Sequence, residues 1–446
     1  MRWPAMLALA GALLGVVIGA HGSTRGNAFA VEPTMFRADA RHGGLYQATG
    51  VPVLHGVKWK FRTAGAIVST PAVSGGTVYF GSSDHNLYAV DVTSGALRWK
   101  FPTHGRISSS PAIAAGRVYF GSYDSAFYAV DAASGTLAWK FATGGERRFS
   151  AKHLHGAEPA AEVMPDPFDV FLSSPVVAGD TVFFGSGDGN VYALEAASGA
   201  LRWRFHTGNV VHASPAVADA TVYVGSWDSY FYALDAATGK ERWRFKTGED
   251  PRINNQIGIQ SSAVVADGVV YFGCRDSHLY AVDAASGARR WAFSTGDSWV
   301  ISSPAVRDGR VYFATSDSGL VQALDARDGH ALFSLDFKHW PFFSSPTLAG
   351  DFLYIGSHAG KVLAIDLKGR KLAWEFATDG ARQNGGTYTR PDGTPNYPAA
   401  ASDSFYDQLI IGFDRMMSVG AVLSTPVIDG DTLYVGSWDG QLYAIG

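Results

Sequence analysis

Two histidines, His153 and His155, are the first residues in the chain with a spacing that suggests chemistry. They are separated by one residue and lie in a stretch rich in aspartate and glutamate. Imidazole nitrogens at this spacing, with carboxylates nearby, can ligate a metal ion. No second pair of this kind occurs in the sequence. The stretch therefore predicts either a metal site or an ordinary solvated polar loop.

Two further stretches carry polar side chains suited to binding. One contains Arg252, Asn254 and Asn255, whose groups can hydrogen-bond to a polar ligand or to the loop's own backbone. The other contains Arg382 and Asn384 and is too long to be a structureless connector. We expect this last stretch to form a lid or an element that docks a partner.

A second group of candidates lies in short links, just before a Ser-x-Pro motif that recurs along the chain. Most positions there are apolar, so a polar or large aromatic side chain is a departure from the pattern. As a group on one rim, these residues are expected to contribute to a ligand site, and the tryptophans could stack on a flat ligand. The five residues are Arg106, His212, Gln260, Trp299 and Trp340.

The sequence lacks the motifs of several classes of enzyme and cofactor site. The sequence contains no G-x-S-x-G elbow, phosphate-binding loop, H-E-x-x-H motif or C-x-x-C-H haem site. Cys274 is the only cysteine, so no internal disulfide can form, and we expect it to be buried and structural. Acidic and basic residues are mixed, no Lys/Arg run exists and the net charge is −4, so nucleic-acid binding is not expected.

The elements that position these residues follow from a pattern that recurs eight times. Each copy contains a Ser-x-Pro strand, a V-Y-F-G-S-x-D strand and turn, an L-Y-A-x-D strand, and S/T-G-x-x-x-W-x-F. The shortest repeat, from Trp59 to Trp99, has the length of one four-stranded blade. Residues 58–61 form a fourth strand without a preceding blade, and residues 442–445 form a third strand with nothing after it. The sequence therefore predicts an all-β, eight-bladed β-propeller of four-stranded antiparallel blades, closed by pairing of the N- and C-terminal strands.

The three long stretches all occupy the same kind of link, from an outer strand to the next inner strand. They should therefore share one face of the ring and arch over its axis, where a ligand site is expected. The opposite face should carry only tight hairpins. The links have 29, 13 and 45 residues, between Thr143 and Ser173, Thr247 and Ser261, and Thr378 and Ser424.

The N-terminus has the pattern of a secretory signal. Arg2 is followed by an apolar run from Met6 to Ala20, and Ala28–Ala30 fits a cleavage site. We expect a signal peptide at 1–30, an extension at 31–56 and the propeller at 57–446. The product should be periplasmic or secreted, soluble after cleavage and without a membrane span, although an uncleaved anchor is the alternative. No cysteine follows the apolar run, so a lipoprotein is not expected.

The A-x-D-x-x-S/T-G-x-x-x-W element, as in Ala233–Trp243, resembles the tryptophan-docking repeat of quinoprotein alcohol dehydrogenases and the repeats of BamB-like outer-membrane assembly proteins. The resemblance extends from about Trp59 to Gly446. It implies the pyrroloquinoline-quinone-like propeller fold, and it raises pyrroloquinoline quinone and calcium as cofactors. The dehydrogenases hold their quinone under a disulfide of adjacent cysteines, which this chain lacks.

Three functions follow from these observations. The first is a periplasmic binding or scaffold module that takes a small-molecule ligand or an envelope protein on its inserted-loop face. The second is a quinone-dependent oxidoreductase, with or without calcium, that uses the same face. The third is an enzyme without a quinone, acting for example on a sugar through carboxylates of the long links. Because a fold of this kind hosts many functions, only the residues of the site can distinguish these three possibilities.

Overall fold

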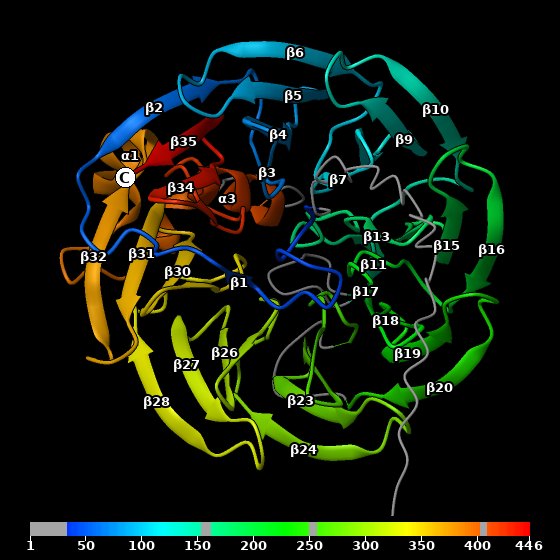
Figure 1. Cartoon of the computed structure of the whole chain (residues 1–446). Helices are drawn as coiled ribbons and strands as arrows, with labels where there is room; N and C mark the ends of the chain where they lie inside the picture. Colours follow the sequence, from blue (N-terminus) through cyan, green and yellow to red (C-terminus); the bar gives the residue numbers. More distant parts are fainter. Residues whose placement is uncertain (1–33, 153–160, 162, 249–256, 402–407) are drawn as a thin grey trace, which may run out of the picture. The chain divides into compact units, whose positions relative to one another are not determined.

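Eight four-stranded antiparallel sheets surround a common axis (Figure 1). The computed structural model describes residues 34–152, 161, 163–248, 257–401 and 408–446, which belong to one compact unit, Val31–Gly446. Blades 1 to 8 follow chain order, and each runs from an inner strand at the axis to an outer strand at the wall. The predicted eight-bladed propeller is confirmed. In the described part of the chain, no helix is long and apolar enough to cross a membrane.

The two strands nearest the axis form the inner half of each blade. From blade 1 to blade 8, the inner strands are β3 (Ala72–Ser74), β7 (Ala112–Ala114), β13 (Val176–Ala178), β17 (Ala216–Ala218), β21 (Val264–Ala266), β25 (Ala305–Arg307), β29 (Thr347–Ala349) and β33 (Val427–Asp429). In the same order, the second strands are β4 (Thr77–Gly81), β8 (Arg117–Ser122), β14 (Thr181–Gly185), β18 (Thr221–Gly225), β22 (Val269–Cys274), β26 (Arg310–Ala314), β30 (Phe352–Ser357) and β34 (Thr432–Gly436).

The other two strands form the outer half of each blade. From blade 1 to blade 8, the third strands are β5 (Asn86–Asp91), β9 (Ala126–Asp131), β15 (Asn190–Glu195), β19 (Tyr230–Asp235), β23 (His278–Asp283), β27 (Leu320–Asp325), β31 (Lys361–Asp366) and β35 (Gln441–Ile445). The outer strands are β6 (Leu97–Pro102), β10 (Leu137–Ala142), β16 (Leu201–His206), β20 (Glu241–Lys246), β24 (Arg289–Ser294), β28 (Ala331–Asp336), β32 (Lys371–Ala377) and β2 (Val57–Arg62).

The repeated tryptophan joins each blade to the next. In the first copy, Trp59 Nε1–H donates to the Val92 carbonyl of the following blade at 3.0 Å. Gly95 lies under the indole with a φ of 69°, and a Cβ there would come within 2.6 Å of the ring. Glycine is therefore needed both for the left-handed backbone and for the close approach of the ring. The same contact between a hairpin glycine and the tryptophan of the preceding blade recurs at Gly135, Gly199, Gly239, Gly287 and Gly329, which explains why the motif is repeated.

The two ends of the chain close the ring. β2 pairs antiparallel with β35, with Phe61 opposite Leu442, and so completes blade 8 as its outer strand. The predicted closure is confirmed. It removes the unpaired third-strand edge that blade 8 would otherwise expose.

A ring of hydroxyl groups joins the inner strands around the axis. In each blade, the backbone N–H of one Ser or Thr donates to the hydroxyl oxygen of the equivalent residue in the next blade, at 2.8–3.3 Å. The eighth bond, from Thr425 N–H to Thr70 Oγ1, closes the circle. These hydroxyls belong to the Ser-x-Pro motif, which explains its recurrence. The participants are Thr70, Ser110, Ser174, Ser214, Ser262, Ser303, Ser345 and Thr425.

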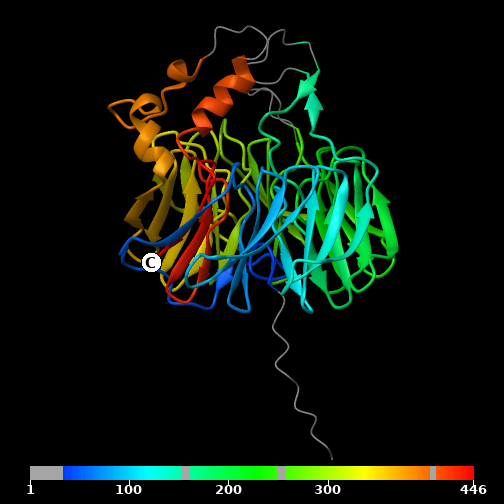
Figure 2. The same cartoon turned by 90° about the horizontal axis from the view of Figure 1, so that it is seen from above.

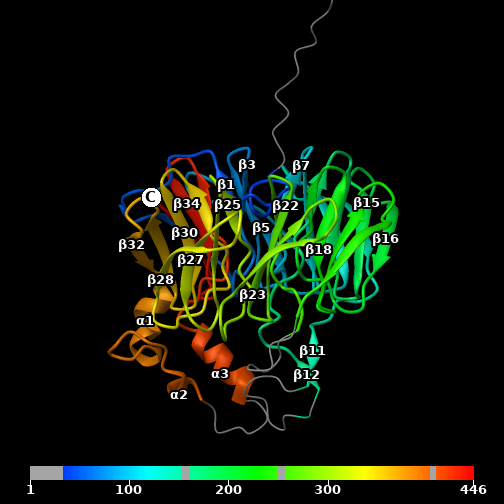
Figure 3. The same cartoon turned by 90° about the horizontal axis from the view of Figure 1, so that it is seen from below.

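The first and third long links project from one face of the ring, as predicted (Figures 2 and 3). They carry β11 (Ser150–Ala151), β12 (Met164–Pro165), α1 (Asp379–Tyr388), α2 (Tyr397–Ala400) and α3 (Gln408–Met417). We call the described residues of 146–172 and 379–421 the canopy. Canopy side chains such as Phe413 and Met417 pack with Trp299, Trp340 and other residues at the channel mouth in one apolar cluster.

The prediction that the opposite face carries only hairpins is wrong. The N-terminal segment Thr34–Gly50 crosses that face and closes the axial channel there. Its β1 (Leu45–Tyr46) pairs parallel with β29, and the Ala40 carbonyl accepts the N–H of Val217 at 2.6 Å. Arg37 is 1% exposed and donates to the carbonyls of two inner-strand prolines at 2.6 Å each. We call this segment the plug.

Cys274 lies at the end of β22 and is fully buried, as predicted. Its Sγ contacts the Gly258 carbonyl at 3.4 Å, and burial raises the pKa of the thiol well above its ordinary value. Because thiolate is the reactive form, a bulky thiol reagent is expected to leave the native protein unmodified for hours. Mass spectrometry after incubation in native buffer checks this, with denatured protein as the positive control. Stoichiometric labelling of the native protein within minutes would contradict the buried placement.

Candidate binding site

The axial channel holds a small chamber between the plug and the canopy. The chamber has a volume of about 30 Å³, which is room for about two water molecules. The hydroxyl ring lines its wall, together with His212 and Gln260. Phe36 of the plug lies at one end, and Phe171 and Phe343 lie at the other. The described residues therefore leave no ligand-sized cavity along the axis.

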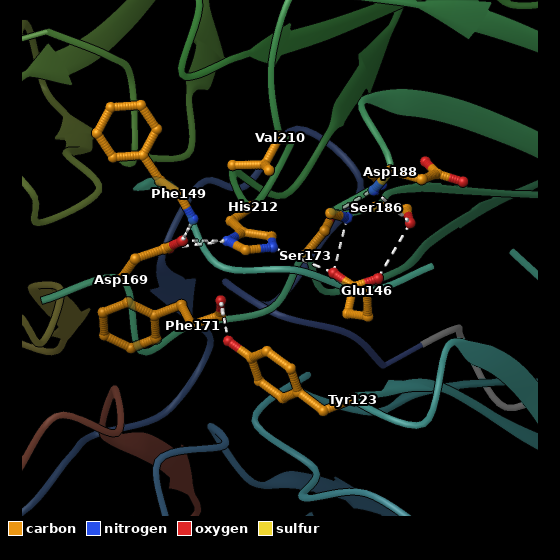
Figure 4. Close-up of polar contacts among 12 residues, drawn as sticks. Tyr123, Glu146, Phe149, Asp169, Phe171, Ser173, Ser186, Asp188, Val210 and His212 are labelled. Carbon is orange, nitrogen blue, oxygen red and sulfur yellow. Dashed lines mark hydrogen bonds and ion pairs between the residues drawn. The ribbon is translucent and has the colours of Figure 1, made fainter. Parts of the chain in front are cut away.

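His212 lies between two carboxylates at the base of the canopy (Figure 4). Its Nδ1 is 2.7 Å from Asp169 Oδ1 and its Nε2 is 3.1 Å from Glu146 Oε1, and the imidazole is fully buried. Burial alone would lower the pKa of His212, but the charge and hydrogen bonds of Asp169 and the hydrogen bond to Glu146 raise it well above its ordinary value. An imidazolium can donate from both nitrogens, which is what two ionised carboxylates require.

The two carboxylates have further donors of their own (Figure 4). Glu146 accepts the Gly187 N–H at 2.7 Å and the Ser186 hydroxyl at 3.0 Å. Asp169 accepts the Phe149 N–H at 2.7 Å. All three charged groups are thus engaged with protein partners, so the cluster holds the first link against blades 3 and 4. It does not present a free set of metal ligands.

Arg275 forms a second buried connection between the canopy and the ring. Its guanidinium lies between the rings of Trp227 and Trp299, 4.3 and 4.2 Å from their centroids. It donates to Asp166 Oδ2 at 2.5 Å and to Gln260 Oε1 at 2.8 Å, and both charged side chains are fully buried. A charge at this depth requires such partners. Arg275 therefore fixes the first link over blades 4 to 6.

The open part of the canopy base carries two arginines without a carboxylate partner. Arg106 lies over the ring of Tyr123 at 4.1 Å, and both Arg106 and Arg148 are partly exposed. Across the residues that the structure describes, neither forms an ion pair within 4.0 Å. Burial raises the pKa of Asp414 on α3, and the positive charges of Arg148 and Arg106 oppose this shift. Both guanidinium groups thus act on Asp414, and both remain partly exposed.

The structure brings some of the predicted site residues together. His212, Gln260, Trp299 and Trp340 all lie at the channel mouth, and Arg106 lies beside them above Tyr123. The first four are buried, and the Nε1–H of Trp340 donates to the Gly393 carbonyl at 2.9 Å. They support the canopy, and only Arg106 faces solvent.

The remaining predicted residues lie elsewhere. Arg382 and Asn384 are on α1, apart from the axial group. Arg382 lies over Phe376 of β32, and Asn384 Nδ2–H donates to the Ser418 carbonyl at 2.7 Å. Five predicted residues are outside the described part of the chain, and their role stays a prediction: His153, His155, Arg252, Asn254 and Asn255.

One sequence pattern could have located the other residues at the channel mouth. It is the variable residue x of the G-S-x-D turn. In most blades this residue points toward the channel mouth, and there it is unusually large or charged. Tyr123, Trp227 and Arg275 occupy it in blades 2, 4 and 5, and His358 and Trp438 occupy the same place in blades 7 and 8. The long links are obvious departures from the repeat, whereas a single large or charged residue inside a regular motif is easily overlooked.

The described residues do not fit a bound quinone. One face of Trp299 is covered by Arg275, its edge meets Phe168 at 5.6 Å, and the side chain is 5% exposed. Its buried Nε1–H has no partner among the described residues, and the same holds for Trp227 Nε1–H and His358 Nε2 at the channel mouth. These unpaired groups are the features that would suit a polar ligand. A planar three-ring molecule would have to displace Arg275 and leave Asp166 as a buried, uncompensated charge.

Comparison with known proteins agrees with the fold. A family model described as "Outer membrane protein assembly factor BamB" matches residues 55–164, 167–298 and 252–396. A crystal structure of BamB from Moraxella catarrhalis is 17% identical, with a TM-score of 0.61, over 88% of this chain and 97% of that one. No curated protein sequence matches the chain.

Two alcohol-oxidising dehydrogenases share the architecture at similar sequence identity. A europium-containing methanol dehydrogenase is 13% identical, with a TM-score of 0.65, over 93% of this chain and 98% of that one. The quinohemoprotein alcohol dehydrogenase from Comamonas testosteroni is 15% identical, with a TM-score of 0.65, over 92% and 80%. These identities show a common fold alone. The family model covers more than half of the chain, so this protein belongs to the family described as outer membrane protein assembly factor BamB and is a propeller of pyrroloquinoline-quinone-like repeats.

Proposed function

We propose that this protein is a binding or scaffold module of the cell envelope, and that its canopy face docks a protein partner. The observation that carries the proposal is the packing at the channel mouth. The residues that could have formed a ligand pocket there are occupied by one another, while the canopy above them presents unpaired groups to solvent. A rigid ring with an elaborated face is a common platform for binding.

The exposed groups of the canopy suit a protein surface. Tyr397 on α2 is 53% exposed and Ile410 on α3 is 39% exposed, and Val163 before β12 is 57% exposed. Arg106 and Arg148 add two unpaired positive charges at its base. Aromatic and arginine side chains are enriched at protein interfaces. The partner is therefore expected to offer an apolar patch with acidic groups beside it.

A photo-crosslinking amino acid placed on the canopy tests this function. We expect replacements at Tyr397 and Ile410 to give a discrete adduct in the native cells, whereas controls at Val53 and Leu372 give none. The controls are 59% and 39% exposed, so they match the canopy positions in accessibility. Equal adducts at all four positions, or adducts at the controls alone, would reject the canopy as the docking face.

Charge reversal at the canopy base provides a second readout. The double variant Arg106→Glu/Arg148→Glu is expected to reduce the canopy adduct at least about fivefold, because a buried or rim charge pair contributes on the order of 1 kcal/mol or more. The melting temperature should fall only slightly, because Arg106 loses its contact with the ring of Tyr123 and both glutamates repel Asp414, while no ion pair within 4.0 Å is broken among the described residues.

The quinone-dependent alternative has a direct test of its own. Calorimetric titration of the protein with pyrroloquinoline quinone, with and without calcium, is expected to show no binding, because Arg275 covers Trp299. Binding at micromolar affinity, about −8 kcal/mol, together with dye-coupled oxidation of an alcohol or sugar, would instead establish an oxidoreductase. Turnover without added quinone would favour the third possibility, a cofactor-free enzyme.

A further inference from the structure

The outer wall of the propeller carries a strongly basic arc that no run of the linear sequence reveals. The outer strands of blades 8, 1, 2, 3 and 4 are β2, β6, β10, β16 and β20, and Figure 1 shows them side by side around the ring. Together they contain eleven Lys or Arg residues and one acidic residue. The outer strands of blades 5 to 7 contain three basic and two acidic residues. We call the first five strands the basic wall.

The arc follows one position of the repeat, the residue directly after the tryptophan. Side chains alternate along a strand, so this residue faces outward when the tryptophan faces the next blade. In blades 8 and 1 to 4 this position always holds an exposed basic residue: Lys60, Lys100, Lys140, Arg204 and Arg244. In blades 5 to 7 it holds Ala292, Ser334 and Glu375. At this position of the repeat, basic residues therefore occur on only one side of the ring.

The centre of the arc is not neutralised by the protein itself. Six of the eleven cations pair with a carboxylate of the protein: Lys58 with Asp431, Lys60 with Asp379, Arg98 with Asp91, Arg202 with Asp180, Arg242 with Asp235 and Arg244 with Glu241. Among the residues that the structure describes, Lys100, Lys140 and Arg204 have no carboxylate within 4.0 Å. The whole chain has a net charge of −4, so this local excess of positive charge is balanced by acidic residues elsewhere. Uncompensated charges concentrated on one surface attract an anion of matching extent.

We propose that the basic wall binds a flexible polyanion, a polymer with closely spaced phosphate, sulfate or carboxylate groups. A cavity of about 450 Å³ lies at one end of the wall against Lys58, but there Asp431 pairs with that lysine. The central cations stand one per blade on a convex surface. A flat anionic membrane would touch only the blade or two nearest to it, whereas a flexible chain can follow the curve and contact all five blades. The docking is electrostatic, so it depends on salt. The basic wall touches the canopy only through Lys60 and Asp379 among the described ion pairs, and the proposal does not depend on the function proposed for the canopy.

The test uses long-chain inorganic polyphosphate as the probe, titrated into the full mature protein at low and moderate salt. Lys100→Glu/Lys140→Glu/Arg204→Glu is expected to weaken binding about tenfold or more and to lower the slope of log K against log salt by about 2. The matched control, Arg289→Glu/Arg370→Glu/Lys371→Glu, changes the net charge equally on the other arc and should weaken binding less than twofold. All six residues are exposed, so both variants should melt like the parent.

Three outcomes would overturn the proposal. The first is that the parent protein does not bind polyphosphate at low salt. The second is that the control variant loses as much affinity as the wall variant, which would mean that only net charge matters. The third concerns vesicles of phosphatidylglycerol. Leu97, Leu137 and Leu201 are the first residues of the three strands that carry the central cations, and they are 47–51% exposed. If the protein binds these vesicles but not polyphosphate, and Leu97→Ser/Leu137→Ser/Leu201→Ser abolishes that binding, the wall is a membrane-docking surface instead.

Discussion

A chain that begins at Thr63 is expected to be less stable, by on the order of 5 kcal/mol or more, than a chain that begins at His55. Only the longer chain contains β2, and neither contains the plug, so the comparison isolates closure of the ring. Loss of β2 removes Trp59, whose ring packs 5.8 Å from Tyr434, and Phe61, which packs on Tyr88 at 5.4 Å. It also unpairs one edge of β35. Chemical denaturation of both chains measures the difference.

The same pair of chains offers a rescue experiment. A synthetic peptide of residues 55–62 added in excess should raise the melting temperature of the shorter chain, because a ligand that binds only the folded state stabilises it by mass action. A peptide with Trp59→Ala and Phe61→Ala is the control and should have no effect. Closely matching denaturation midpoints for the two chains, with no response to the peptide, would show that β2 contributes little to the ring.

Most of the ring could be predicted from the sequence because the repeated residues are the ones that pack neighbouring blades together. The hairpin glycine admits the tryptophan of the preceding blade, as Gly95 admits Trp59, and the inner-strand hydroxyls join neighbouring blades. These interactions connect equivalent positions about one repeat apart. The incomplete first and last copies then implied closure, which the pairing of Phe61 with Leu442 confirms.

The plug could not be predicted in the same way. Residues 34–50 contain no copy of the repeat, and their partners lie far away in the sequence. Arg37, for example, donates to the Pro304 and Pro346 carbonyls, 267 and 309 residues further on. An isolated arginine in a polar segment gives no sign that it will be buried in a channel. Only the assembled ring creates the ring of carbonyls that accept its hydrogen bonds.

The position of several candidate residues near the axis could be predicted from the sequence, but the partners of their side chains could not. His212 and Gln260 interrupt an apolar position of the repeat, and both lie at the channel mouth. Their partners come from the first long link, where Asp166 and Asp169 are only two of several loop carboxylates. Arg275 resembles an ordinary turn residue in the sequence, although it forms the stacked cation between two tryptophans. Long-range pairing of this kind depends on the fold of the link, which no local pattern encodes.

Replacing His212 by Gln is expected to destabilise the protein by about 3–5 kcal/mol. The imidazole is fully buried against the fully buried Asp169 carboxylate, so the variant leaves that carboxylate without its charged partner. Thermal or chemical denaturation near neutral pH measures the loss. A change below about 1 kcal/mol would contradict the charged pairing shown in Figure 4.

A double variant separates charge from packing. Asp169→Asn/His212→Gln removes both charges and keeps two groups that can hydrogen-bond to each other. It should be more stable than the sum of the single variants predicts, because the cost of an unpaired buried carboxylate is gone. Additive effects of the two single substitutions would mean that Asp169 and His212 do not interact as a pair.

The dependence on pH follows from the raised pKa of His212. The unfolded chain protonates this residue near the ordinary value of about 6.5, whereas the folded protein holds the proton to higher pH. The resulting stabilisation is complete below about pH 6.5 and is lost as the pH rises through the folded-state pKa. The stability difference between the parent and His212→Gln should therefore be largest at about pH 6 and shrink toward about pH 9. A difference that stays constant or grows over this range would show that His212 is neutral in the folded protein.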